Sequence, residues 1–346
     1  MTRLLLLALG GALLLAACGN DDASPAVSRS PSGGLTETPA GPAAVSPTPA
    51  AGAPQVTPAS SPAAAPGTPA QPTPAPATTQ PAPGDPVLVG AGDIASCYSD
   101  GDEATAALLD AIPGTVFTAG DNAYQAGSAA DFGGCYEPSW GRHKARTRPS
   151  PGNHDYATDG AYGYYSYFGD LAGPAGRGYY SYDLGAWHII ALNSNCWAVS
   201  CDAGSEQEQW LRADLAAHPA ACTLAYWHHP RFSSGLHGGD STLQPFWQAL
   251  YDYGTDIVIS GHDHDYERFA PQAPDGRADP NNGIREFIVG TGGASHYGFG
   301  SVASNSEVRD SSTFGVLKLT LHPTSYDWQF VPVAGEAFTD SGSEAC

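Results

Sequence analysis

The sequence predicts an α/β fold for residues 85–346, on three observations. Short apolar runs of β type alternate along this part of the chain with segments that have helical spacing of apolar residues. Four of the runs end in motifs of Gly, Asp and His, as expected where strands bring polar side chains to the edge of a sheet. Near the C-terminus the runs follow one another without helices, which predicts more continuous β structure there.

Residues 1–18, which precede this domain, predict an export signal. One Arg is followed by the apolar stretch 4–17, which is too short for a comfortable membrane span. The stretch ends in LAAC, residues 15–18, which resembles the bacterial lipobox, where the signal is removed and Cys18 carries lipid. The alternative is an ordinary signal peptide cleaved near Ala17, with a chance cysteine behind it. We therefore expect an exported lipoprotein, anchored to a membrane at the cell surface or on the periplasmic face.

Residues 19–84 predict a disordered tether between the anchor and the domain. Sixteen of the chain's 30 prolines lie there, with almost no large apolar side chains, so the segment cannot bury a core. Residues 85–346 are long enough for one large domain. Nearly all of the formal net charge of −21 belongs to that domain. Such an acidic body argues against nucleic acid as a primary partner, because phosphate backbones need basic faces. No feature of the sequence indicates an oligomeric state.

The cysteines predict disulfides rather than a zinc–thiolate site. Cys18 aside, an even number remains in a chain expected to be exported, which predicts three disulfides. These cysteines are Cys97, Cys135, Cys196, Cys201, Cys222 and Cys346. Their pairing stays open, with Cys196 and Cys201 as the local guess. None has CxxC spacing, which disfavours a zinc–thiolate site.

The expected elements follow in order along the domain. Strands are expected at 87–89, 115–118, 187–192, 223–227, 256–260, 286–289, 316–321 and 326–331. Helices are expected at 102–112, after a capping box that begins at Ser205, and at 243–251. The first helix would present Ala106, Ala107 and Leu109 on one face.

Five polar motifs indicate a metal site. GD at 92–93, GDNAY at 120–124, WHHP at 227–230 and GHDHDYER at 261–268 each follow an expected strand, and GNHD at 152–155 is a turn-rich loop. Ligands bind beyond the carboxyl ends of strands in open α/β sheets, so these motifs would meet at one sheet edge. In an extended segment His262 and His264 would point the same way. The donors are Asp93, Asp121, Asn153, His228, His262 and His264.

These donors favour two metal ions over one. Carboxylate, amide oxygen and imidazole suit Zn, Mn or Fe and disfavour thiophilic metals. Their number exceeds what a single tetrahedral ion needs, so two ions sharing a carboxylate are the economical arrangement. Any one of these residues alone would be explained by a role in a turn or a cap.

The ordered set GD, GDNAY, GNHD, WHHP and GHDHDYER, over residues 92–268, resembles the calcineurin-like metallophosphoesterases and, within them, the purple acid phosphatases. Many members carry histidine two positions after the first aspartate, where this chain has Ala95. Tyr124, three residues after Asp121, instead matches the tyrosine that ligates Fe(III) in purple acid phosphatases. The N-terminal β-sandwich of the large plant enzymes is absent. The resemblance implies a two-sheet α/β/β/α sandwich with a dinuclear metal site at the C-terminal edge of its strands.

Residue by residue, the resemblance implies two metal sites that share Asp121. The Fe(III) site would consist of Asp93, Asp121, Tyr124 and His264. The second site, for divalent Fe, Zn or Mn, would consist of Asp121, Asn153, His228 and His262.

Further residues would surround the ions. The resemblance places His154 near the phosphate, where it stabilises charge or protonates the leaving group. His237, nine residues after His228, is the best match to a second outer histidine, with a solvated loop histidine as the alternative. His229 would lie at most behind the ligands, and Asp155, Asp263 and Asp265 would either orient imidazoles or be exposed.

The resemblance implies an extracytoplasmic phosphomonoesterase that acts on a small phosphate ester through a metal-bridging hydroxide. A phosphodiesterase acting on nucleotides or lipid headgroups is the alternative, because the same metal core performs both reactions and only the cleft walls discriminate. A third hypothesis is a non-catalytic surface lipoprotein that keeps the fold for binding. Lost ligand positions would indicate it, and in this chain none is lost.

Overall fold

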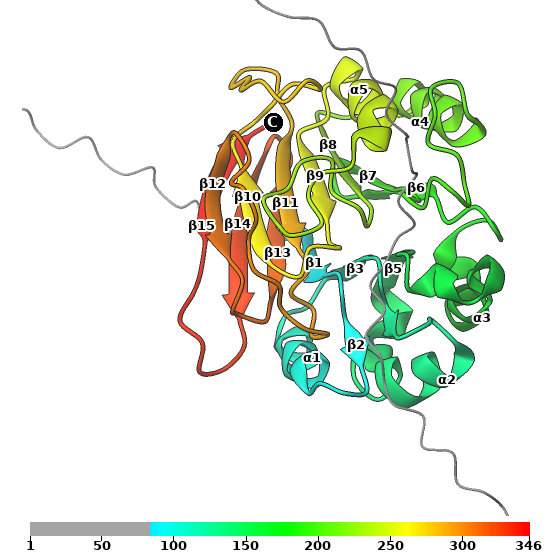
Figure 1. Cartoon of the computed structure of the whole chain (residues 1–346). Coiled ribbons are helices and arrows are strands. Elements are labelled where there is room, and N and C mark those ends of the chain that lie inside the picture. Colours follow the sequence, from blue (N-terminus) through cyan, green and yellow to red (C-terminus); the bar gives the residue numbers. More distant parts are fainter. Residues whose placement is uncertain (1–83) are drawn as a thin grey trace, which may run out of the picture. The chain divides into compact units, whose positions relative to one another are not determined.

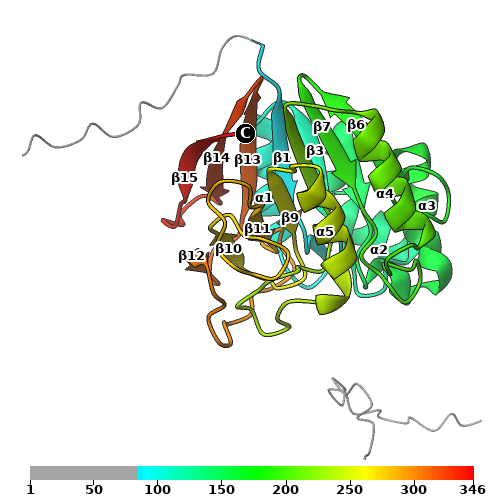
Figure 2. The ribbon, with the colours of Figure 1, turned by 90° about the horizontal axis from the view of Figure 1, so that it is seen from above.

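A computed structural model describes residues 84–346. The predicted signal, the lipobox cysteine Cys18 and the tether up to residue 83 lie outside these residues. The described part of the chain contains two large β-sheets packed face to face, with helices beside them (Figures 1 and 2). The predicted α/β sandwich of two sheets is therefore confirmed.

The first sheet has six strands in the order β15-β14-β13-β1-β3-β5. Three short strands run parallel, namely β1 (Val87–Ala91), β3 (Thr115–Ala119) and β5 (Thr147–Ser150). The C-terminal strands continue this sheet in antiparallel fashion, namely β13 (Gly315–His322), β14 (Ser325–Pro332) and β15 (Ser341–Ala345). The chain's last strands thus complete the sheet that its first strand begins.

The second sheet has seven strands in the order β12-β10-β11-β9-β8-β7-β6. Its parallel strands are β7 (Trp187–Ala191), β8 (Cys222–Tyr226), β9 (Ile257–Ser260) and β11 (Arg285–Val289). Its antiparallel strands are β6 (Tyr180–Leu184), β10 (Tyr266–Phe269) and β12 (Ser306–Asp310). A separate parallel pair joins β2 (Ala95–Ser96) to β4 (Ala123–Tyr124).

Five α-helices and several short 3₁₀ or π-helical segments connect these strands within residues 84–346. The α-helices are α1 (Gly101–Ala111), α2 (Ala129–Asp131), α3 (Tyr162–Phe168), α4 (Glu206–Ala217) and α5 (Gln244–Asp252). The π-helical segment is η1 (Phe132–Tyr136), and the 3₁₀ segments are η2 (Trp140–Arg146), η3 (Asp155–Ala157), η4 (Asp159–Ala161), η5 (Gly169–Ala172) and η6 (Ser241–Leu243).

Alternation along the central strands divides the core into two layers. On β9, Ile257 and Ile259 join the core between the two sheets, whereas Val258 faces the helices on the other side. There Leu211 of α4 and Trp247 of α5 cover the second sheet. Successive side chains of a strand point to opposite faces, so a strand buried on both faces is apolar throughout. Each large side chain buried in this way contributes roughly 1.5–3 kcal/mol.

Three sequence predictions about elements need correction. Ala107 is exposed, because the buried face of α1 runs through Asp102, Thr105, Ala106 and Leu109. The Ser205 hydroxyl does accept from the Glu208 amide, but the Glu208 carboxylate accepts from the Gly204 amide, so the capping box is not closed. Strands β5, β6, β10, β12 and β15 were not predicted, since they are polar or aromatic and their pairing with neighbouring strands, rather than apolar periodicity, defines them.

The three predicted disulfides are present. Cys196 pairs with Cys201, as guessed from proximity, and the long-range bonds join Cys97 to Cys135 and Cys222 to Cys346. Cys222–Cys346 ties the first residue of β8 to the last residue of the chain. Among residues 84–346, no helix has the length and apolar character to cross a bilayer.

Candidate metal centre

The predicted donors come together where parallel strands of both sheets end. Asp93 follows β1, Asp121 follows β3 and Asn153 follows β5, all in the six-stranded sheet. His228 follows β8 and His262 follows β9, both in the seven-stranded sheet. The prediction of a single sheet edge was therefore wrong. The donors belong to two edges, which meet because the two sheets pack face to face.

Left-handed backbone turns aim three of the donors. Asp93, Asp121 and His262 have φ angles of 58°, 49° and 70°. Such a conformation costs of order 1 kcal/mol or more for a residue other than glycine, and it persists only where the surroundings enforce it. The HDHD segment is a series of bends, so the prediction that His262 and His264 face the site from extended backbone was wrong. Positive φ at His262 directs it instead.

Glycines let the backbone approach these side chains. A Cβ atom on Gly152 would lie 2.0 Å from Oδ1 of Asp121, and one on Gly261 would lie 2.5 Å from Oδ2 of Asp93. Neither position has room for a side chain. Glycine is therefore required at both places for the carboxylates to keep their present positions.

The first group of donors surrounds the hydroxyl of Tyr124. That oxygen lies 2.8 Å from Oδ1 of Asp93 and 3.0 Å from Oδ2 of Asp121. It also lies 3.1 Å from Nε2 of His264, which is itself 3.2 Å from Oδ1 of Asp93. All four side chains are buried. A phenol, two carboxylates and an imidazole thus converge on one point.

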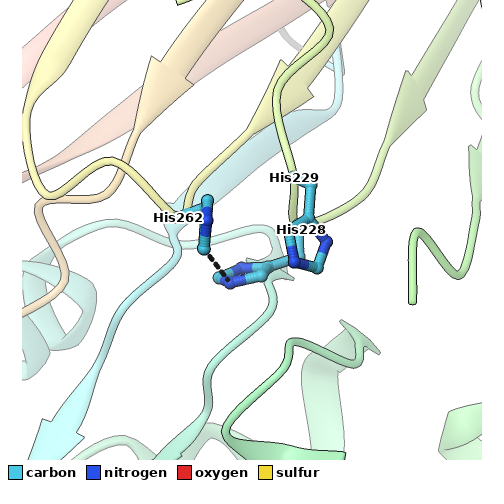
Figure 3. Close-up of side chains that lie close together, drawn as sticks. All are labelled: His228, His229 and His262. Carbon is cyan, nitrogen blue, oxygen red and sulfur yellow. Dashed lines mark hydrogen bonds between the residues drawn. The ribbon is translucent and has the colours of Figure 1, made fainter. Parts of the chain in front are cut away.

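The second group surrounds Nε2 of His228. This nitrogen lies 2.9 Å from Oδ1 of Asn153, 3.2 Å from Nδ1 of His262 and 3.3 Å from Oδ2 of Asp121 (Figure 3 shows the contact with His262). Two imidazoles, an amide oxygen and a carboxylate therefore form a second convergence. Asp121 Oδ2 is common to both groups.

These donor separations are those expected of ligands around metal ions. With bonds of about 2.0–2.2 Å, neighbouring ligand atoms of an octahedral or tetrahedral ion lie about 2.8–3.6 Å apart. Asp93 and Asp121 offer carboxylate oxygens within 4.8 Å of one another, and two such charges without a cation would repel at a buried site. The residues present therefore fit two ions that share Asp121, the harder oxygen-rich set lying around Tyr124 and the nitrogen-rich set around His228.

In the metal-free protein a proton on a histidine compensates part of the negative charge of these carboxylates. Burial would raise the pKa of Asp121, but the facing His228, together with His154 and His262, holds it well below its usual range. Burial likewise opposes charge on His228, yet Asp121 raises the pKa of His228 to about 9. His228 thus carries a proton at neutral pH, and metal binding has to displace it, which makes metal affinity dependent on pH.

Tyr124 and His262 are neutral in the metal-free protein. Burial, with the neighbouring Asp121 and Asp93, raises the pKa of Tyr124 well above its usual value. Burial and the positive charge on His228 lower the pKa of His262 well below its usual value. A cation with high charge density is needed to ionise a buried phenol that lies beside two carboxylates.

The groups that orient the imidazoles were not identified from the sequence. His228 Nδ1 donates to the Ala119 carbonyl over 2.8 Å, and His264 Nδ1 lies 2.7 Å from the hydroxyl of Ser295. Tyr297 stacks on His264 with ring centroids 4.1 Å apart. Ser295 and Tyr297 belong to the segment TGGASHY, which follows β11. A glycine-rich segment after an apolar strand was the signal that could have revealed them.

Three aspartates predicted as exposed or imidazole-orienting have other surroundings. Asp155 accepts from the amides of Gly152 and Asn122 and so shapes the GNHD loop, and burial raises its pKa to about 7. Asp263 accepts from the backbone amide of His237 and from a serine hydroxyl. Asp265 is fully buried, and burial together with Asp263 raises its pKa to about 9. None of them contacts an imidazole ring nitrogen through a hydrogen bond in the described residues.

Three further histidines lie around the donors. His154 Nε2 is 4.0 Å from Asp121 Oδ2, while its Nδ1 donates to the Gln125 carbonyl over 2.6 Å. The ring of His237 lies 4.4 Å from that of His262, next to the second group rather than in an isolated loop. His229 lies beside His228 and His262 (Figure 3), and its Nδ1 is 2.9 Å from the Ser194 hydroxyl. Burial and the charge on His228 lower the pKa of His229 to about 3.

Comparison with known proteins agrees with this geometry. The calcineurin-like phosphoesterase family matches residues 86–266, just over half of the chain. Purple acid phosphatase 15 of Arabidopsis thaliana is 36% identical over 96 residues, which are 26% of this chain and 18% of that protein. Purple acid phosphatase 18 of the same plant is 33% identical over 121 residues, 33% of this chain and 26% of that protein. The matched stretch therefore spans only about a fifth to a quarter of these relatives.

A solved structure shows the same fold. A purple acid phosphatase from yellow lupin (Lupinus luteus) seeds superposes with a TM-score of 0.61 at 20% sequence identity. The match covers 76% of this chain and 54% of the lupin chain.

Proposed function

Because the chain belongs to the calcineurin-like phosphoesterase family, we propose that its folded part, residues 85–346, hydrolyses phosphate monoesters at the centre built around Asp121. The observation that carries this proposal is the position of Asp121 Oδ2, which lies within 3.0 Å of the Tyr124 hydroxyl and 3.3 Å of His228 Nε2. One carboxylate oxygen serves both donor groups. A binding protein with no hydrolytic role would have no need to keep both groups complete.

The donor chemistry supports a mixed-valent pair of ions. The group around Tyr124 offers a phenol and two carboxylates, which suit Fe(III), whereas the neutral Asn153 makes the other group less negative and suits divalent Fe, Zn or Mn. Two ions bound there would activate a water and neutralise the charge that develops on the phosphate oxygens. The purple acid phosphatases among the relatives support this assignment.

His154 supplies the proton in the proposed reaction. Its Nδ1 donates to the Gln125 carbonyl, so the form that transfers a proton is the imidazolium, which carries a second proton on Nε2, the atom that faces the centre 4.0 Å from Asp121. Its side chain is about one-third exposed, so it can reach both the buried donors and an incoming ester. Donating that proton to the leaving oxygen would avoid expelling an alkoxide. His237, beside His262, would hold a phosphate oxygen.

Hydrolysis of paired substrates tests this proposal. The purified full chain, loaded with iron plus zinc or manganese, is given an aryl phosphate monoester and the corresponding bis-aryl diester. A strong monoester preference is the expected result. A diester preference would reassign the protein as a phosphodiesterase, and no hydrolysis of either ester with full metal content would leave a binding protein.

We further propose that the protein is exported and anchored through Cys18. The three disulfides support export, since such bonds persist in oxidising compartments. Labelling of cells with a radioactive fatty acid tests the anchor. Label should enter the wild-type chain and be absent from a Cys18→Ser variant, and equal labelling of both would refute the anchor.

A further inference from the structure

The segment between β7 and α4 exposes an aromatic side chain close to the metal centre. Of the chain's seven tryptophans, Trp197 is the one with a largely exposed side chain, at 71%. The Cys196–Cys201 disulfide closes the loop that carries it. An indole held in water on a covalently closed loop costs solvation free energy that a packed position would avoid. The indole is therefore open to contact with a ligand.

Three hydrogen bonds of the two residues just before this loop attach it to the centre. The Ser194 hydroxyl accepts from the backbone amide of His229 and lies 2.9 Å from its Nδ1. The Asn195 amide donates to the carbonyl of Pro151 over 3.2 Å, directly before the GNHD motif. Trp197 is three residues beyond Ser194, so the backbone between them spans at most about 10 Å. The loop is thus fixed to a neighbour of the second donor group and to the segment that carries Asn153.

The side chain of Trp197 also contacts a residue close to the GNHD motif. Its ring meets that of Tyr156 edge-on, with centroids 5.5 Å apart. Tyr156 follows His154 by two residues, and its hydroxyl accepts from Asn193 over 2.8 Å. Trp197 therefore contacts the segment that carries His154, the proposed proton donor.

A cavity adjoins the same loop. It has a volume of about 340 Å³ and is lined by loop residues 198–200 together with Arg177, Tyr179 and Gln207. Ligand pockets are typically of about this size or larger. The Arg177 guanidinium lies 5.7 Å from the Tyr179 ring and pairs with Glu206. The cavity thus offers aromatic and polar contacts beyond the indole.

We propose that Trp197 and this cavity form a leaving-group subsite that selects phosphate esters with a planar aromatic ring. This inference rests on the proposed function and adds the substrate class. The ring stacks on the exposed indole while the phosphate reaches the metal centre. Aryl phosphates and nucleoside phosphates share this chemistry.

Binding of phosphonates, which are not hydrolysed, tests the subsite without relying on turnover. The metal-loaded full chain is titrated calorimetrically with benzylphosphonate and with ethylphosphonate. Trp197→Ala should weaken benzylphosphonate binding about ten-fold and leave ethylphosphonate within about two-fold, as expected for the loss of one stacked ring. Trp197→Phe should restore most of the affinity. Tyr253→Ala, which removes an exposed ring at the end of α5, before β9 begins, should change neither.

Steady-state kinetics then compare phosphate esters that carry an aromatic ring with esters that lack one. Trp197→Ala should raise KM for phenyl phosphate relative to ethyl phosphate, or for adenosine monophosphate relative to ribose phosphate, with kcat little changed. Equal effects on all ligands, or no effect on any, would overturn the subsite. Absence of hydrolysis in the metal-loaded wild type would refute the proposed function instead, and the phosphonate ratio would still decide the subsite.

Discussion

The hydroxyl of Tyr124 lies 3.0 Å from Oδ2 of Asp121, the one carboxylate oxygen that both donor groups share. Replacing Asp121 should therefore disturb both metal sites at once. We expect Asp121→Ala to lose most of its bound metal and to reduce kcat/KM by at least about a thousand-fold, because bridging and charge compensation both disappear. Elemental analysis after dialysis, alongside activity, measures this.

Asp252→Ala provides the control, since Asp252 lies at the end of α5 and pairs with Arg212. An Asp121→Ala protein that keeps two metal ions and its activity would contradict the bridging role.

Tyr124 should determine the colour of the iron form. We expect the metal-loaded wild type to be violet, because a phenolate bound to Fe(III) absorbs visible light. Tyr124→Phe should remove the visible band, and absorption spectroscopy at equal iron content measures the difference. Tyr165→Phe is a matched control, since its hydroxyl contacts Tyr156 and no donor of the centre. A variant without Tyr124 that stays violet would show that another residue ligates the iron.

His154 should matter most for esters with poor leaving groups. Its proton stabilises the departing oxygen, so His154→Ala should lower kcat for an alkyl phosphate by about a hundred-fold or more. From an aryl phosphate with an acidic phenol, the phenolate leaves without protonation. The kcat for that ester should therefore fall much less. The ratio of the two kcat values is the measurement. Equal losses for both esters would indicate that His154 positions the phosphate and does not donate a proton.

His188 should make folding stability depend on pH. It is buried on β7, and its two ring nitrogens lie 3.0 Å from Asp183 and 2.8 Å from Asp214, while His218 stacks on the ring. Burial would lower the pKa of His188, but the hydrogen bonds with the two carboxylates raise it above its usual value. A raised folded pKa gives stability that is fully present below the unfolded pKa of about 6.5 and is lost as pH rises through the folded value.

Urea unfolding of the wild type and of His188→Gln measures this effect. The stability advantage of the wild type should fall by on the order of 1–2 kcal/mol between about pH 6 and about pH 9. Changes at the metal centre affect both proteins and cancel in the difference. An advantage that is constant or grows with pH would contradict the ion pair.

The Cys222–Cys346 disulfide should stabilise the fold more than the Cys196–Cys201 disulfide. The first closes a sequence separation of 124 residues and the second a separation of 5. Loop-closure entropy predicts about 4–5 kcal/mol for the long loop and about 2 kcal/mol for the short one. Thermal unfolding of the two double Cys→Ser variants compares them. A larger loss from the short loop would mean that strain or packing outweighs chain entropy.

Much of the centre was predictable because its donors follow strands. The apolar runs before Asp93, Asp121, His228 and His262 are strong strand signals, and strand ends are where ligand-binding side chains gather. The kinds of donor alone predicted Zn, Mn or Fe. The edge strands, and the contacts that orient the imidazole rings, were harder to predict from the sequence. Ser295 reaches His264 from 31 residues away, and such a contact leaves no periodic signal in the sequence.

By itself the sequence determined the kinds of side chain available and indicated the apolar strands and the helices α1, α4 and α5, because composition and periodicity act over a few residues. Tertiary structure decided which atoms meet. Only the packing of two sheets brings Asp121 from one and His228 from the other within 3.3 Å, and only the left-handed turn at His262 aims its ring at them. Sheet pairing and buried electrostatics are non-local interactions, so no single stretch of sequence contains them.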